Sequence, residues 1–231
     1  MNRAKKLCAI STHVYTSAGI IFSFMAAQAL ISQDIRLFLL SLFAAVIIDG
    51  TDGPLARKCA IQDVLPNFDG AKLDDLIDYL TYVFLPCMGL VQFQVLPSGL
   101  TWIAVIPMLA GLYGFCQKNA KTSESFVGFP SYWNVIFLYL YILDMPPAGT
   151  LSILLLFSAL TFVPLQYIYP NKTRWMQRTT LLLSVVYAAV IAFICFFPHS
   201  DWVREAVFIS LFYPIYYLVV SFIHHYHYRP S

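Results

Sequence analysis

Residues 181–197 read LLLSVVYAAVIAFICFF and contain no charged side chain. Similar apolar runs cover Val135–Leu143 and Leu151–Phe162, and Leu39–Ile48 is interrupted only by one serine. A membrane-spanning helix needs about 20 predominantly apolar residues, and runs approaching this length recur along the whole chain. Of the 231 residues, 59% are hydrophobic and 11% are charged, whereas a soluble domain carries roughly 25% charged residues. The sequence therefore predicts an all-α integral membrane protein.

The apolar runs define eight candidate transmembrane helices when each is extended to its polar, glycine or proline boundary. They cover residues 14–32, 36–57, 70–93, 99–117, 131–143, 148–169, 177–197 and 204–226. The fifth is short, and an alternative start near Ser125 would place a kink at Pro130. Before the first helix, Met1–Lys6 is basic, and we expect a short interfacial segment rather than a cleaved signal peptide. A single polytopic domain, residues 1–231, accounts for the chain.

The basic residues test this count, because eight spans place both termini on one side of the membrane. Of the 14 lysines and arginines, only Arg36 and Arg204 fall on the side opposite the termini. The others are Arg3, Lys5, Lys6, Arg57, Lys58, Lys72, Lys118, Lys121, Lys172, Arg174, Arg178 and Arg229. Cytoplasmic loops carry an excess of lysine and arginine, so we expect both termini in the cytoplasm.

The five cysteines lie at positions 8, 59, 87, 116 and 195. Their number is odd, and they form neither a CxxC pair nor a Cys/His spacing typical of zinc sites. We therefore expect free thiols and no zinc.

Seven of the 12 acidic residues fall between positions 49 and 78. They are Asp49, Asp52, Asp63, Asp69, Asp74, Asp75 and Asp78. Asp49 ends one apolar run and Asp78 precedes another, so both are expected inside spanning helices near their cytoplasmic ends. A carboxylate inside the membrane costs about 2.5 kcal/mol or more, so a neutralising partner is required. Asp69 is expected to cap a helix that begins at Gly70.

Helical spacing predicts how these acids meet. Asp49 and Asp52 are three residues apart, and Asp74 and Asp78 are four apart, so each pair lies on one helix face. Consecutive antiparallel helices can bring both faces around one small volume. An oxygen-only cluster suits Mg²⁺ or Mn²⁺, and four carboxylates are enough for two ions. Two-metal sites promote in-line phosphoryl displacement.

Small residues lie among these acids. Residues 49–57 read DGTDGPLAR and residues 70–78 read GAKLDDLID. The small positions are Gly50, Gly53, Ala56 and Gly70. They would let a ligand reach the backbone, with close helix packing as the alternative.

This pattern, D-x-x-D-G-x-x-A-R followed by G-x-x-x-D-x-x-x-D, resembles the signature of the CDP-alcohol phosphotransferase family, and every specified position matches. One departure is the 12 residues between Arg57 and Gly70, a longer connection than most of the family has. The departure affects the loop and leaves the two helix faces unchanged. The resemblance implies an enzyme that works as a homodimer.

The resemblance also implies roles for the motif residues, which span the ends of the second and third helices. Asp49, Asp52 and Asp74 would hold Mn²⁺ or Mg²⁺, two ions in all, while Asp78 would both touch metal and act as general base. The CDP group would be received by Gly53, Ala56 and Arg57. No nucleic-acid partner is expected.

Two further segments resemble those of a bacterial branch of the family, whose enzymes transfer the phosphatidyl group of CDP-diacylglycerol to choline. They are residues 65–70, LPNFDG, and residues 126–134, FVGFPSYWN. This branch implies release of CMP and a place in the bacterial inner membrane, with the active site facing the cytoplasm. Serine is the nearest alternative acceptor, because enzymes that use serine carry a similar Gly-x-Pro-Ser loop, and another alcohol is also an alternative. A second alternative is an ion-coupled transporter, although its acids would lie near the bilayer midplane on repeated, broken helices.

Choline is a quaternary ammonium and binds through aromatic faces. Candidate aromatic residues on the cytoplasmic side are Tyr15, Tyr79, Tyr82, Tyr132 and Trp133. Tyrosine and tryptophan also serve as interfacial anchors, so position in the sequence does not distinguish a choline site from an anchor.

Overall fold

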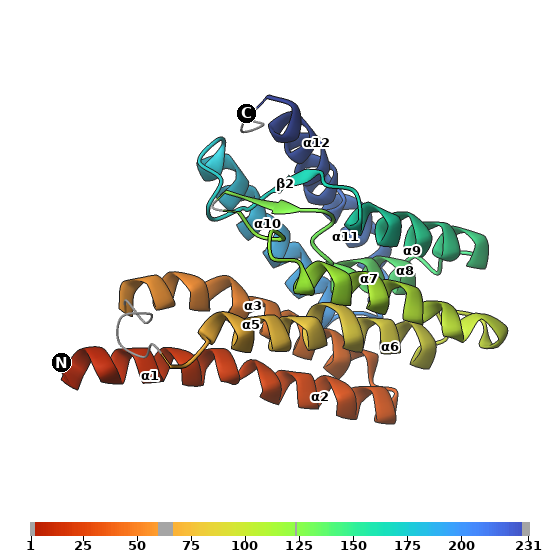
Figure 1. Ribbon diagram of the computed structural model, residues 1–231. Helices are drawn as coiled ribbons and strands as arrows, with labels where there is room; N and C mark the ends of the chain where they lie inside the picture. The colour runs from red at the N-terminus through yellow and green to blue at the C-terminus, as the bar shows by residue number, and fades with distance from the viewer. Residues whose placement is uncertain (1–2, 60–66, 123, 228–231) are drawn as a thin grey trace.

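The computed structural model describes residues 3–59, 67–122 and 124–227, which form a bundle of helices with one short sheet (Figure 1). The first half contains α1 (Arg3–Ser17), α2 (Gly19–Ser32), α3 (Ile35–Cys59), α5 (Gly70–Asp78), the π-helical η1 (Tyr79–Phe84), α6 (Leu85–Gln92), the 3-10 helix η2 (Ser98–Ala104) and α7 (Val105–Cys116). The second half contains β1 (Ser125–Val127), α8 (Trp133–Ile142), α9 (Pro147–Thr161), β2 (Gln166–Ile168), α10 (Gln177–Phe196), α11 (Val203–Ser210) and α12 (Phe212–His227).

The first two helices, α1 and α2, follow one another almost in line, and α3 returns beside them (Figure 1). Gln33 ends α2 in the left-handed region, and its N–H reaches the carbonyls of Ala29 and Leu30. Asp34 then accepts a hydrogen bond from the Leu37 N–H at 2.9 Å, which begins α3. The expected basic N-terminal segment is therefore helical from Arg3 and continues into the first long apolar helix.

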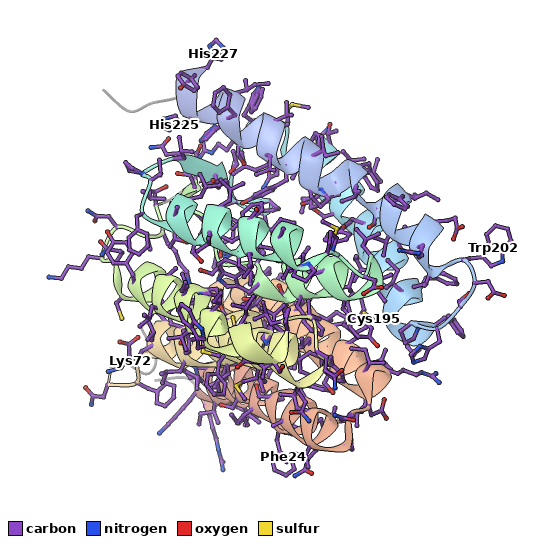
Figure 2. The ribbon with its side chains drawn as sticks, turned by 90° about the vertical axis from the view of Figure 1, so that its right-hand side faces the viewer. Phe24, Lys72, Cys195, Trp202, His225 and His227 are labelled. Carbon is purple, nitrogen blue, oxygen red and sulfur yellow. A yellow bond between two sulfur atoms is a disulfide. The ribbon has the colours of Figure 1, made fainter. Side chains whose placement is uncertain are left out.

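Four helices are long and apolar enough to cross a membrane among the residues described: Lys6–Ser32, Ser98–Cys116, Gln177–Phe196 and Val203–His227. Two shorter apolar helices, Trp133–Ile142 and Pro147–Thr161, accompany them. Phe24 and Trp202 project from the bundle, with 63% and 71% of their surface exposed (Figure 2). A surface this apolar belongs in a bilayer, so the chain is a helical membrane protein.

One short sheet interrupts the mostly helical architecture. Residues 125–127 pair antiparallel with residues 166–168, which lie within the alternative start of the fifth expected helix near Ser125 and within the expected helix 148–169. Gly128 adopts φ +81°, a left-handed conformation that favours glycine and ends any helix through this point. Pro164 lacks an N–H and disfavours helix in the residue before it, so α9 ends at Thr161.

The sheet is held against α12 by side-chain hydrogen bonds. Ser221 accepts from the Ile168 N–H at 3.0 Å, and the Tyr217 hydroxyl donates to the Ile168 carbonyl at 3.0 Å. At the other end of β2, His225 Nδ1 accepts from the Gln166 N–H at 3.2 Å. These bonds satisfy backbone groups on the open edge of β2 and fix the position of the loop that follows it.

The expectation of free thiols is wrong for two of the five cysteines. Cys8 on α1 and Cys59 at the end of α3 form a disulfide, with their Cα atoms 5.7 Å apart. Because α1 and α3 pack side by side, two cysteines 51 positions apart in sequence become neighbours. Cys87, Cys116 and Cys195 are free thiols, as expected.

Candidate active site

The first acidic pair lies on the last three turns of α3. Asp49 and Asp52 follow the apolar part of this helix and are separated by three positions, so both lie on related faces. Asp52 is buried, with 6% of its surface exposed, and Asp49 is partly buried. Thr16 of α1 donates a hydrogen bond to Asp52 Oδ2 at 2.7 Å. The carboxylate of Asp52 is thus held on the side of α1.

The second acidic pair lies on α5, whose start is set by a cap. The Asp69 side chain accepts a hydrogen bond from the Lys72 N–H at 3.0 Å, as the sequence predicted. One turn separates Asp74 from Asp78 on this helix, and Asp78 is buried. The cap therefore fixes the register from which both carboxylates project.

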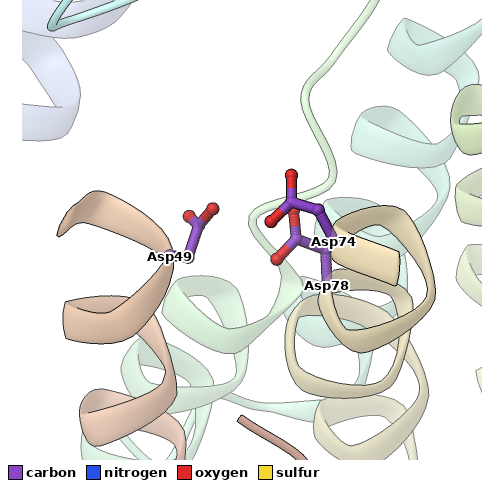
Figure 3. A group of neighbouring side chains, drawn as sticks. All are labelled: Asp49, Asp74 and Asp78. Atoms are coloured by element: carbon purple, nitrogen blue, oxygen red, sulfur yellow. The ribbon is translucent and has the colours of Figure 1, made fainter. Parts of the chain in front are cut away.

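Three of the four predicted carboxylates meet between α3 and α5. Asp49, Asp74 and Asp78 each offer one oxygen, and these oxygens lie within 4.8 Å of one another. Figure 3 shows Asp49 facing Asp74 and Asp78 across the space between the two helices. We call these three residues the acid cluster. Asp52 lies about one turn beyond Asp49 on α3, and its carboxylate is not among the oxygens that lie within 4.8 Å of one another.

Tyr82 orients Asp49 from within the π-helical segment η1. Its hydroxyl donates to Asp49 Oδ2 at 2.7 Å, and the tyrosine is buried with 8% of its surface exposed. π-Helical turns are uncommon and occur frequently at functional sites. Tyr82 is one of the five aromatic candidates for a choline site or an interfacial anchor, and in the structure its hydroxyl bonds to a carboxylate of the acid cluster.

Lys121 is the cation next to these acids, and no sequence motif identifies it. Its Nζ lies 2.7 Å from Asp75 Oδ1 and 3.9 Å from Asp74 Oδ2. Burial disfavours its charged form, but the hydrogen bond to Asp75 and the nearby acids outweigh burial, so the pKa of Lys121 is raised. Among the described residues, Lys121 makes the only ion pairs with the acids of α3 and α5.

The small residues of the motif have different surroundings. A side chain added at Gly50 would meet nothing within 4 Å, so the α3 backbone is open there. A Cβ at Gly70 would lie 2.5 Å from His13 Cε1, so this glycine permits α1 and α5 to approach. Gly70 therefore serves helix packing, whereas access of a ligand to the backbone at Gly50 stays a prediction.

The predicted CDP-binding residues lie on the last turns of α3. Arg57 is exposed, and a Cβ at Gly53 would lie 3.5 Å from Arg57 Nη1. Ala56 packs against a small apolar cluster formed by Ala9 and Cys59. These three residues are near the acid cluster in the fold, and their contact with a nucleotide stays a prediction.

The acid cluster has the chemistry of a site for hard divalent cations. It offers only carboxylate oxygens, which suit Mg²⁺ or Mn²⁺, and its members are buried or partly buried. A single lysine within 4 Å cannot neutralise three carboxylates. The residues present therefore fit a divalent metal ion.

Comparison with known proteins agrees with the motif. The model of the protein family described as CDP-alcohol phosphatidyltransferase matches residues 10–211 of this chain. A protein from Pseudomonas aeruginosa named phosphatidylcholine synthase is 36% identical over 81% of this chain and 78% of its own length. Proteins of the same name from Legionella bozemanae and Legionella pneumophila are 36% and 32% identical, over 78% and 91% of this chain and 87% and 86% of their own lengths.

Proposed function

We propose that this chain is a phosphatidylcholine synthase, because it belongs to the CDP-alcohol phosphatidyltransferase family. It would transfer the phosphatidyl group of CDP-diacylglycerol to choline and release CMP. The observation that carries this proposal is the acid cluster of Asp49, Asp74 and Asp78, in a chain similar over most of its length to proteins named phosphatidylcholine synthase.

We further propose that Asp49, Asp52, Asp74 and Asp78 hold two Mn²⁺ or Mg²⁺ ions. When bound, these ions would neutralise charge on the pyrophosphate of CDP-diacylglycerol and on the departing CMP. Tyr82 and Thr16 would orient Asp49 and Asp52 through the hydrogen bonds described above. Lys121 would keep Asp75 neutralised beside the cluster.

Asp78 is the proposed general base. A new bond forms between the choline oxygen and the phosphorus that carries diacylglycerol, and the bond from that phosphorus to the bridging pyrophosphate oxygen breaks. CMP leaves with the electron pair of that bond, and the choline hydroxyl proton passes to an Asp78 oxygen. Asp78 is buried, with 9% of its surface exposed, so the proton is shielded from bulk water.

The CDP group is proposed to lie along the end of α3, at Gly53, Ala56 and Arg57. The exposed Arg57 guanidinium can approach phosphate oxygens, and the backbone is open at Gly50, about two turns earlier on α3. The acyl chains would stay in the leaflet while the nucleotide faces the aqueous side.

We propose that the chain forms one domain with eight membrane spans in the inner membrane of a bacterium. Both termini and the acid cluster would face the cytoplasm. Cys116 allows a test, since it is exposed at the end of α7 while the free thiols of Cys87 and Cys195 are buried. A membrane-impermeant maleimide should label Cys116 in inverted vesicles and leave it unlabelled in intact spheroplasts. The reverse pattern would invert the proposed orientation.

We also propose that the protein is a homodimer, as the family resemblance implies. Native mass spectrometry of the detergent-purified protein should give a mass of two chains. A single chain that retains full activity would rule out an obligatory dimer.

The function is tested by offering purified protein CDP-diacylglycerol with Mn²⁺ and, separately, choline, serine, inositol or glycerol phosphate. CMP release is expected with choline alone, and it should disappear after chelation by EDTA and return with Mn²⁺ or Mg²⁺. Release with serine alone would make the protein a phosphatidylserine synthase. No release with any alcohol would favour a transporter.

A further inference from the structure

A second group of residues gathers beside the acid cluster, at the sheet and the loop that follows it. Phe126 of β1 stacks on Tyr169, with ring centroids 4.3 Å apart and an angle of 20° between the planes. The Lys172 ammonium lies over the Tyr169 ring, 4.0 Å from its centroid. We call these three residues the aromatic platform. A cation placed over an aromatic face is the arrangement by which proteins bind ammonium groups.

The platform is linked to the acid cluster through Lys121. The backbone of Lys121 pairs with that of Phe126 in an antiparallel bridge. Residues paired directly in this way project their side chains to the same face of the ladder. Since Lys121 reaches Asp75 from that face, the Phe126 ring lies on the side of the sheet that faces α5.

The electrostatic surroundings of Tyr169 support this placement. Burial raises the pKa of Tyr169 to about 12, and the negative charges of Asp49, Asp74 and Asp78 contribute in the same direction. Burial lowers the pKa of Lys172, and the positive charges of Arg57 and Lys121 add to that shift. The platform therefore lies within the electrostatic field of both the acids and the predicted nucleotide-binding arginine.

Hydrogen bonds hold the platform in place. The Thr173 hydroxyl accepts from the Tyr169 N–H at 2.7 Å and donates to the carbonyl of Glu124. Thr173 is buried, with 2% of its surface exposed. The loop after β2 is thus tied to Glu124, the residue that precedes β1, and the Tyr169 ring has a defined orientation next to the Phe126 ring.

The aromatic residues identified from sequence make other contacts. Tyr82 donates to Asp49, Tyr15 shares a hydrogen bond with Thr51 at 2.7 Å, and the Tyr79 hydroxyl donates to the Met108 carbonyl at 3.3 Å. Tyr132 packs among other rings, with the Tyr217 ring centroid 5.8 Å away. Trp133 is buried in the helix core with 1% of its surface exposed. Tyr169 is the ring of this region that already carries a cation.

We propose that the Tyr169 face, supported by Phe126, receives the trimethylammonium group of choline during the reaction, with Lys172 occupying the same face in the absence of choline. The inference rests on the proposed function and deepens it by assigning the acceptor site. A quaternary ammonium cannot donate a hydrogen bond, and an aromatic face attracts it through the negative charge density above the ring. Lys172 has a flexible side chain and can leave the ring for the solvent or for a substrate phosphate.

The test compares Tyr169→Leu, Tyr169→Phe and the wild type in choline-dependent CMP release with saturating Mn²⁺. Tyr169→Leu removes the aromatic face and should raise the KM for choline by roughly 3- to 30-fold, with little change in the KM for CDP-diacylglycerol. Tyr169→Phe keeps the face and should stay close to the wild type. Tyr226→Leu is the matched control, because Tyr226 is 65% exposed on α12 and should leave both constants unchanged.

A second measurement uses tetramethylammonium as an inhibitor that has the cation of choline without its hydroxyl. It should compete with choline in the wild type and in Tyr169→Phe, and its inhibition constant should rise in Tyr169→Leu in parallel with the choline KM. In Lys172→Met the inhibition constant should fall, because the internal cation no longer occupies the ring. An unchanged choline KM in a folded Tyr169→Leu, or a rise in the KM for CDP-diacylglycerol instead, would overturn the inference. Wild-type protein that fails to use choline would instead overturn the proposed function.

Discussion

The acid cluster and the aromatic platform lie beside each other but are built in different ways. The cluster comes from two helices within 30 positions of sequence, and helical spacing alone sets which carboxylates share a face. The platform joins Phe126 to Tyr169 across a two-stranded sheet, and its orientation depends on hydrogen bonds from Thr173. We therefore expect the acid cluster to serve the chemical step and the aromatic platform to serve choline binding. Changes in the cluster should reduce turnover at saturating choline, whereas changes in the platform should raise the KM for choline.

The largest effect is expected from Asp78→Asn. Loss of the general base should lower kcat by roughly 10²- to 10⁴-fold, while CDP-diacylglycerol binding is largely retained because the other carboxylates remain. Turnover is measured by CMP release, and binding by equilibrium dialysis of labelled CDP-diacylglycerol in Mn²⁺.

The matched control for that variant is Asp75→Asn on the same helix. Asp75 pairs with Lys121 and lies outside the acid cluster, so its amide variant should keep most of the activity. If Asp78→Asn lost substrate binding together with turnover, Asp78 would be a binding residue and its role as base would be abandoned.

A smaller effect is expected from Tyr82→Phe, which removes one hydroxyl and keeps the ring. Asp49 loses the donor at 2.7 Å that orients it, and residues that orient metal ligands typically change metal affinity or activity by about 10- to 100-fold. The concentration of Mn²⁺ for half-maximal activity should rise, with little change in the KM for choline. A selective change in the choline KM would instead place Tyr82 with the platform.

Much of the cluster follows from local sequence. The spacing of Asp49, Asp74 and Asp78 predicted that helix faces would meet, and the structure gathers their oxygens within 4.8 Å. The Asp69 cap was also predictable, because a capping carboxylate acts within three residues of its own position. The bounds of α3 and α10 lie within two residues of the expected ones for the same reason, since an apolar run and its polar boundary are local features.

The platform could not be derived in this way. β1 and β2 are three residues each, too short to show an alternating pattern, and their pairing joins positions about 40 apart. Lys121 approaches Asp75 across 46 positions, and Cys8 reaches Cys59 across 51. One local signal was present: Gly128 and Pro164 both interrupt the helices that hydropathy predicted.

Thr16→Val tests whether Asp52 works with the cluster although it lies outside the group of three. The substitution keeps the shape of the side chain but removes the hydroxyl that donates to Asp52 Oδ2 at 2.7 Å. A hydrogen bond of this kind contributes about 0.5–1.5 kcal/mol, so kcat/KM should fall by roughly 2- to 13-fold, with a matching rise in the Mn²⁺ requirement. Ser23→Ala on α2, whose hydroxyl donates within its own helix, is the control. An unchanged Mn²⁺ requirement in Thr16→Val would leave Asp52 without support as a metal ligand.

The smallest effect is expected from Lys121→Met, which breaks the link between the two regions. The Lys121 side chain is 39% exposed and that of Asp75 is 38% exposed, so their ion pair contributes little by itself, about 0.2–1 kcal/mol. Its position matters more, because Lys121 pairs with Phe126 through the backbone and with Asp75 through its side chain. Loss of the ammonium should therefore change the choline KM and kcat together, each by roughly 1.5- to 5-fold, as measured by CMP release over a range of choline concentrations. A change confined to kcat would assign Lys121 to the acid cluster alone, and the two regions would then be independent of each other.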